Sequence, residues 1–112
     1  MSALLTLPPP ERPTAVIAYN DVMALGALHA IRAHHLRVPE DISVIGFDDV
    51  ASAALYTPPL TTVRQPMEGM GSLAVSIVVD GMNAVLEKRD VTTVHRKVAP
   101  ELVVRESTRL VP

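Results

Sequence analysis

Two adjacent carboxylates follow an apolar run in the segment VIGFDD, residues 44–49. At neutral pH Asp48 and Asp49 offer only acceptor oxygens. Two such oxygens at one rigid strand end can accept hydrogen bonds from neighbouring hydroxyls or from a ring N–H, as sugars and purines present them. A second polar pair, Asn20 and Asp21, follows the apolar run TAVIAY. Because the Asn20 amide both donates and accepts, it suits a hydroxyl that does the same. These residues predict a site for a polar small molecule, with Asp48 as the leading candidate.

Each of these residues also has a purely structural alternative. Asp48 could cap the turn that follows it, and for Asp49 the role of a cap is favoured over ligand binding. Asn20 suits helix N-capping as well as ligand contact, and both roles are compatible. Asp21, in the first turn of a helix, is already favourable through the helix dipole. Gln65, which ends another strand-like run, could be an ordinary polar strand terminus.

The elements around these residues form a βαβ pattern. Residues 14–19, TAVIAY, are continuously apolar, which is typical of a strand covered on both faces. Apolar residues at helical spacing predict a helix over 22–34, capped by Asn20 or Asp21 and ended before Pro39. Residues 42–47, ISVIGF, predict the next strand. Two strands joined by one crossover helix are expected to be parallel and right-handed, with their carboxyl ends at one sheet edge, where ligands bind. Asn20 and Asp48 should therefore lie within about 10 Å, given a strand spacing of about 4.8 Å.

The rest of the chain supplies further elements. Four prolines between residues 8 and 13 predict an extended connector, so residues 1–13 are taken as a proline-rich lead-in. Residues 50–56 predict a short helical turn, 60–65 a third strand and 102–106 a last strand. A long helix is predicted over Met67–Lys88, with an apolar stripe at Met70, Leu73, Ala74, Ile77, Val78, Met82 and Val85. Its three glycines each cost roughly 1 kcal/mol relative to alanine, so packing must hold the helix.

Composition limits the functional classes. The 112 residues are 48% apolar with a net charge of −2, which fits one soluble domain or less. The ten Lys and Arg residues are dispersed, so the chain lacks the basic face that binding to duplex DNA requires. There is no cysteine, which excludes disulfides and thiolate metal sites. No segment is judged long or apolar enough to span a bilayer, and the first residues lack the basic region of a signal peptide, so no membrane partner is expected.

No enzymatic chemistry is predicted. Histidines His29, His34, His35 and His95 lack the i, i+4 pairing that would bring two imidazoles onto one metal, so no metal or other cofactor is expected. A phosphorylated receiver domain would need its acid pair on the first strand and a lysine at a strand end, where Lys97 does not lie. A carbohydrate hydrolase would need two separated carboxylates, whereas Asp48 and Asp49 are adjacent. No catalytic residue is assigned.

Three phrases in order carry a resemblance to a known family. The sequence PTAVIAYNDVMALGALHAIRAHHLRVPEDISVIGFDD, followed by TPPLTTVRQP and PELVVREST, resembles the carboxyl-terminal part of the effector domain of lactose-repressor (LacI/GalR) family transcription regulators. The similarity runs from Pro13 to Thr108. It implies an α/β fold, namely a parallel-sheet βαβ lobe of a type I periplasmic-binding-protein-like fold that is partial and mostly the second lobe. Residues 14–112 would then be a partial effector-binding domain, with helix 67–88 belonging to the first lobe.

The resemblance also implies roles for individual residues and for partners. Asp48, Asn20 and Gln65 would contact an effector, a sugar or a purine-like molecule. Leu25, Leu28 and Tyr56, otherwise core residues, would form a subunit interface in a homodimer. The protein would be cytoplasmic and would reach operator DNA only through an amino-terminal helix-turn-helix that these residues do not contain. The alternative function is that of a periplasmic sugar-binding protein of a transport system, which shares the fold. Dimerisation through the stripe of helix 67–88 and weak effector binding are expected, because half of the cleft and the lobe that would cover the stripe are missing.

Overall fold

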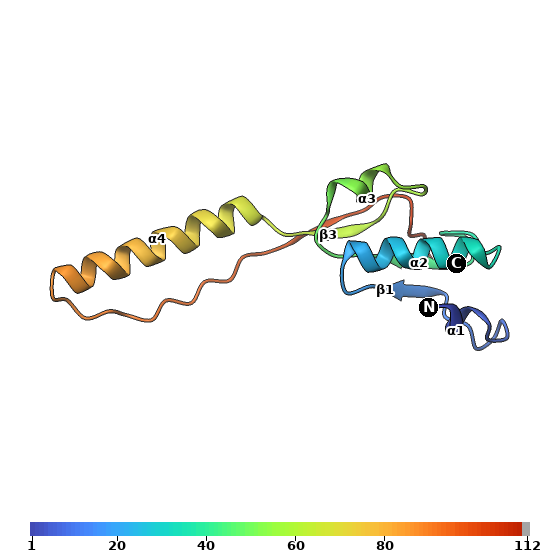
Figure 1. Ribbon diagram of the computed structural model, residues 1–112, viewed down its shortest axis with the longest axis horizontal. Coiled ribbons are helices and arrows are strands. Elements are labelled where there is room, and N and C mark those ends of the chain that lie inside the picture. Colours follow the sequence, from blue (N-terminus) through green and yellow to red (C-terminus); the bar gives the residue numbers. More distant parts are fainter. Residues whose placement is uncertain (111–112) are drawn as a thin grey trace. The chain divides into compact units, whose positions relative to one another are not determined.

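The computed structural model describes residues 1–110 and divides the chain into two compact units. Unit 1 comprises residues 1–64 and the residues from Glu101 onward, and unit 2 comprises Gln65–Pro100. The elements, drawn in Figure 1, are α1 (Ser2–Leu5), β1 (Ala15–Ile17), α2 (Asp21–Ala33), β2 (Ser43–Ile45), α3 (Ala51–Leu55), β3 (Thr62–Arg64), α4 (Met67–Leu86) and β4 (Glu101–Val103).

The strands of unit 1 form two short paired ladders that are linked to each other. β1 and β2 are parallel, with Ile17 opposite Ile45, and β3 and β4 are antiparallel. Parallel bridges from Ile45 to Thr61 and from Asp48 to Arg64 join β2 to β3. The predicted βαβ unit is confirmed, because parallel β1 and β2 are connected through α2. Their carboxyl ends meet at one edge, since the Asp21 amide donates to the Phe47 carbonyl at 2.8 Å.

The core of unit 1 lies between α2 and the strands. Ile31 of α2, Ile42, Val44 of β2 and Leu60 are fully buried and belong to one apolar cluster. The apolar face predicted for α2 is confirmed only in part: Leu28 and Ile31 are buried in this core, whereas Val22 is 69% exposed. The buried face of α2 includes Ala24 and Ala27 instead. The predicted end of this helix is also confirmed, because α2 ends at Ala33 and the chain turns at residues 37–42 before β2.

Two predictions for the first part of the chain are wrong. β1 is not covered on both faces, because the Ile17 side chain is 84% exposed. Its continuous apolar sequence suits a strand between two layers, whereas among the described residues only the side facing α2 is packed. The lead-in is not an extended connector. Leu5 of α1 is buried in the core, and the amides of Glu11 and Arg12 both donate to the Pro8 carbonyl and so form a turn.

The last strand ends earlier than predicted, because the residues after it bond to other partners. β4 spans Glu101–Val103 rather than 102–106. Ser107, which is fully buried, donates its hydroxyl to the Val44 carbonyl at 2.6 Å and accepts from the Thr61 amide at 2.7 Å. The Val44 amide in turn donates to the Ser107 carbonyl at 2.8 Å. The tail thus holds β2 and β3 together through one serine.

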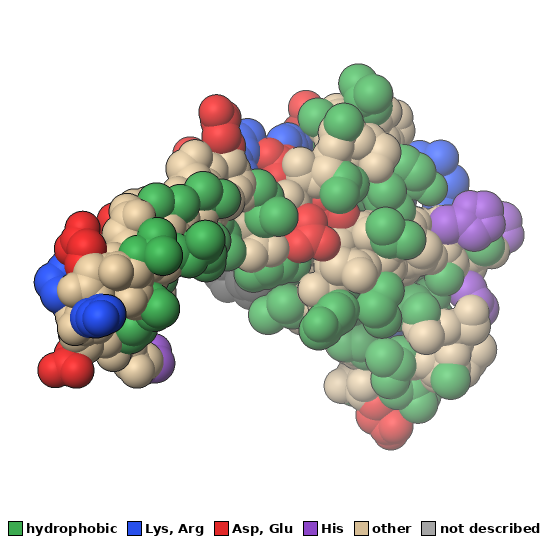
Figure 2. Space-filling view, turned by 60° about the vertical axis from the view of Figure 1, so that its left-hand side comes forward, with side chains coloured by type: hydrophobic (Ala, Val, Ile, Leu, Met, Phe, Trp, Pro, Cys, Tyr) green, Lys and Arg blue, Asp and Glu red, His purple; other side chains and the backbone are tan. Residues whose placement is uncertain are grey.

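Unit 2 consists of α4 and the chain that returns from it. The predicted long helix is confirmed, although it ends at Leu86 rather than Lys88. Figure 1 shows the returning segment running beside the helix, and the two enclose a hollow lined by Leu73, Ile77 and Gly81 on one side and by Val91 and Val94 on the other. Ala84 is the only buried residue of α4. Figure 2 shows hydrophobic side chains gathered along this helix, and the exposed ones include Val75, Val78, Val79, Met82, Val85 and Leu86.

The expectation that no segment could span a membrane does not hold for α4 by length and composition. The helix has 20 residues, its most apolar stretch of 18 residues has a mean hydropathy of 1.5, and it passes that test among the described residues. A helix of about 20 apolar residues is long enough for the hydrocarbon core of a bilayer. Length and composition do not separate such a helix from one that a soluble domain buries, so this criterion alone assigns no membrane role.

Candidate ligand-binding edge

Asn20 lies between β1 and α2, immediately before α2, and it caps that helix. The Asn20 Oδ1 atom accepts a hydrogen bond from the Met23 amide at 2.9 Å, and the backbone of Asn20 is extended, as N-cap residues require. The predicted capping role is therefore confirmed. Capping uses only the amide oxygen, so it does not engage the donor group that an effector hydroxyl would need. The effector role of Asn20 stays a prediction.

Asp21 is fully buried, which the sequence reasoning missed. Its Oδ1 atom accepts from the Thr62 hydroxyl at 2.5 Å, and its Oδ2 atom accepts from the Val50 amide at 2.8 Å. A buried carboxylate without hydrogen bonds is very unfavourable, and these two donors meet that need. Asp21 is not the N-cap of α2. A favourable interaction with the dipole of α2 accounts for only part of the role of Asp21. Asp21 ties the start of α2 to β3 and to the start of α3.

Gly46 shows how tightly the chain surrounds Asp21. A Cβ atom at position 46 would overlap the Asp21 Oδ1 atom and would come within 3.2 Å of the Asp21 Cα atom. Only a residue without a side chain fits there, so the glycine of the GFDD phrase gives Asp21 its space. A glycine at the end of an apolar strand was the one signal in the sequence that pointed to a close approach at this edge.

The loop formed by Asp48 and Asp49 has an unusual backbone. Both residues have positive φ angles, 114° for Asp48 and 57° for Asp49. Non-glycine residues adopt such conformations at a cost of order 1–3 kcal/mol each, and they keep them only when the surroundings enforce them. The Asp48 amide donates to the Val63 carbonyl at 2.9 Å, which anchors the loop to β3. Asp48 itself is exposed at the carboxyl end of β2, as an effector-binding residue must be.

Asp49 forms two ion pairs and is not a helix cap. The N-cap of α3 is Val50, whose side chain makes no capping bond, so the predicted capping role of Asp49 is wrong. The Asp49 carboxylate instead contacts Arg64 Nε at 2.6 Å and Arg105 Nη2 at 2.5 Å, and its side chain is only 9% exposed. Burial raises the pKa of Asp49, but the hydrogen bonds and charges of Arg105 and Arg64 outweigh burial and leave that pKa below its usual value. Neither partner is close in sequence, so no local pattern could reveal these pairs.

The other predicted site residues are placed as follows. Gln65 directly follows β3 and is the first residue of unit 2, and its contact with an effector stays a prediction. Leu28 is 3% exposed and belongs to the core cluster, so its assignment to a subunit interface is wrong. Leu25 and Tyr56 are partly buried against the same core, and their interface role stays a prediction.

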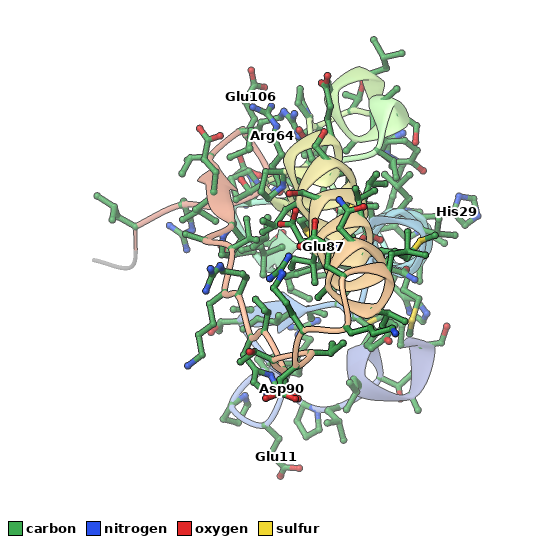
Figure 3. The ribbon with its side chains drawn as sticks, turned by 90° about the vertical axis from the view of Figure 1, so that its left-hand side faces the viewer. Glu11, His29, Arg64, Glu87, Asp90 and Glu106 are labelled. Atoms are coloured by element: carbon green, nitrogen blue, oxygen red, sulfur yellow. The ribbon has the colours of Figure 1, made fainter. Side chains whose placement is uncertain are left out.

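Metal ligands do not gather in the described part of the chain. Among residues 1–110 no three His, Asp or Glu side chains lie close enough together to hold a metal ion. His29, labelled in Figure 3, projects outward from α2. A surface hollow lies at the carboxyl-terminal end of α2, away from Asn20, where it is lined by Arg32, Leu36 and Thr57 among others. The hollow is thus separate from the predicted ligand edge.

Comparisons with known proteins place the chain in a family. Residues 2–108 match the periplasmic binding protein-like domain. The HTH-type transcriptional repressor PurR of Pasteurella multocida is 47% identical over 97 residues, which cover 87% of this chain and 28% of that protein. A regulatory protein of the LacI family from Chloroflexus aggregans has a similar structure, with a TM-score of 0.83 and 37% identity over 96% of this chain and 37% of that one. A LacI family regulator from Lactobacillus casei with bound sucrose gives a TM-score of 0.77 at 32% identity, over 96% of this chain and 38% of that one.

The chain thus spans less than a third of the length of PurR and well under half of each solved regulator. The family match includes all of α4, so this helix is accounted for as part of the domain. The chain is 32–47% identical to these regulators over 87–96% of its length, so the similarity is one of sequence as well as of fold. The chain belongs to the periplasmic binding protein-like family, and within it to the effector domains of LacI/GalR-type regulators.

Proposed function

We propose that this chain forms part of the small-molecule sensor of a LacI/GalR-type transcription regulator, and that Asp48 and Asn20 contribute to its effector site. The observation that carries this proposal is the exposed Asp48 carboxylate at the carboxyl end of β2, next to the strand end that presents Asn20. In open parallel sheets this edge is where ligands bind. The expected effector is a sugar or a purine-like molecule, since both present the adjacent donors that a carboxylate accepts.

The relatives favour a regulator over the sugar-binding protein of a transport system. PurR and the matched solved structures are transcription regulators, and one of them holds sucrose. Transcription regulators of this kind are not enzymes. A cytoplasmic location and indirect contact with operator DNA follow from the same reasoning. The 112 residues themselves have neither a basic face nor a recognition helix, so they should not bind duplex DNA at physiological salt.

Nuclear magnetic resonance titration of the 112-residue chain tests the effector site. Sugars and purine bases at millimolar concentration should shift the amide signals of Asn20 and Asp48 with weak affinity. Asp48→Asn should abolish those shifts, because an amide replaces one acceptor oxygen with a donor. Asp41→Asn is the matched control, since Asp41 pairs with Arg37 on the surface. Shifts confined to the hollow near Arg32, or shifts that survive in Asp48→Asn, would refute this site.

We further propose that the chain forms homodimers, in which the apolar residues of α4 are covered together with Leu25 and Tyr56. Exposed apolar patches of several hundred Å² mark association surfaces. Sedimentation equilibrium at micromolar concentration should give a dimer, and Val78→Glu should shift it toward the monomer. Ser72→Glu adds the same charge at an exposed polar position of the same helix and should leave the dimer intact. A monomer whose α4 amides are protected from exchange would contradict the dimer.

A further inference from the structure

The backbone at Asp48 and Asp49 needs a tether, because two consecutive non-glycine residues occupy the left-handed region. A loop of this kind relaxes unless surrounding contacts enforce it. The Asp49 side chain is almost fully covered and pairs with two arginines. The tether is therefore expected at Asp49.

Each carboxylate oxygen of Asp49 binds a different arginine. Oδ2 contacts Arg64 Nε at 2.6 Å, and Oδ1 contacts Arg105 Nη2 at 2.5 Å. Arg105 is itself fixed, because its Nη1 atom donates to the Leu60 carbonyl at 2.8 Å and its amide donates to the Thr61 hydroxyl at 2.9 Å. With only 17% of the Arg105 side chain exposed, water replaces little of the Asp49 contact if that contact is lost.

Arg64 extends this set of contacts to the points where the chain leaves and re-enters unit 1. Arg64, labelled in Figure 3, is the last residue of unit 1 before unit 2 begins, and Glu101 is the first residue of unit 1 after it. Arg64 Nη1 contacts Glu101 at 3.5 Å while Arg64 Nε contacts Asp49. Asp49 is thus joined by charge to Arg64 at the carboxyl end of β3 and, through Arg64, to Glu101 at the start of β4.

We propose that Asp49 is a positioning residue: it holds the loop that presents Asp48, and it couples effector contact at that loop to the order of β3 and β4 at the two crossings between units. The coupling rests on the proposed effector role of Asp48. Because linkage is reciprocal, an effector that stabilises the loop also stabilises the β3–β4 end, and loss of the clamp weakens effector binding.

Amide hydrogen exchange in the 112-residue chain tests the clamp without any effector. Asp49→Asn should speed exchange about tenfold or more at Asp48 and at the amides of β4, because the clamp closes local openings of these segments. The Val44 amide, bonded to Ser107, should change far less. Asp41→Asn, which also removes one charge from an Asp–Arg pair, should leave the loop and β4 unchanged. A uniform increase that includes Val44 would show a general loss of stability and would overturn the coupling.

A milder variant guards against unfolding. Arg64→Gln leaves the Arg105 pair in place, and it should speed exchange at β4 more than at Asp48. Unchanged β4 amides in both variants would overturn the coupling.

The effector arm then uses any sugar or purine that shifts the Asp48 signal. Its dissociation constant should rise about tenfold in Asp49→Asn and stay constant in Asp41→Asn. An exchange effect without any ligand shifts would retain the clamp and reject the effector site. Ligand shifts with equal affinity in both variants would retain the effector site and reject the coupling.

Discussion

Replacing Asp21 by alanine should destabilise the chain strongly, although Asp21 is not one of the predicted effector-binding residues. The substitution removes both acceptors, one for the Thr62 hydroxyl and one for the Val50 amide. A hydrogen bond to a charged group contributes about 1.5–3 kcal/mol, and buried donors left without partners add a penalty. The expected loss is about 3–5 kcal/mol, a large part of the 5–15 kcal/mol that holds a typical domain folded.

Urea unfolding followed by circular dichroism measures this loss, provided that the slope with urea is unchanged. Asp80→Ala removes the same charge from an exposed position of α4 and should change the free energy of unfolding by less than about 0.5 kcal/mol. Asp21→Asn keeps the volume and one acceptor oxygen, so it should fall between the wild type and Asp21→Ala.

A double-mutant cycle isolates the contact with Thr62. Thr62→Val removes the hydroxyl at nearly constant volume, and the coupling energy between Asp21→Ala and Thr62→Val should be about 1–3 kcal/mol. Additive effects would show that the 2.5 Å contact contributes nothing to stability. A loss under about 1 kcal/mol for Asp21→Ala would refute the view that this carboxylate joins α2, α3 and β3.

Three further outcomes are expected. Gly46→Ala should destabilise the chain by more than about 2 kcal/mol in thermal unfolding, because its Cβ would overlap Asp21, whereas Gly26→Ala, with open space around it, should stabilise α2 by up to about 1 kcal/mol. Asp48→Gly should be more stable than Asp48→Ala by about 1 kcal/mol in urea unfolding, because glycine tolerates the φ of 114°; equal stability would contradict the strain. The pKa of Asp49 lies below the usual 3.8. The stability that the Asp49 carboxylate contributes is therefore complete above pH 3.8 and is lost as the pH falls through the lowered pKa. Below about pH 4 the stability of Asp49→Asn should depend less on pH than that of the wild type.

The local sequence determined the helix and strands that bring Asn20 and Asp48 to one edge of the sheet. The i, i+3 spacing of α2, the apolar strands on either side of it and the short joints dictated a parallel βαβ unit, so Asn20 and Asp48 had to emerge at one edge. The capping role of Asn20 was readable for the same reason, because its partner Met23 lies three residues away. The ordered phrases around these elements also sufficed to predict the family.

The partners of the buried acids were decided only by the tertiary structure. Asp21 bonds to Val50 and Thr62, 29 and 41 residues away, and Asp49 pairs with Arg105, 56 residues away. Periodicity reports which face of a helix or strand is apolar, but it carries no information about which distant donor meets a carboxylate at the end of that element. The same limit explains Leu28, whose apolar side chain fits a core and an interface equally well until α2 is packed on β2. The partners of Asp21 and Asp49 and the burial of Leu28 depend on which distant segments meet in space, and only the folded chain defines those meetings.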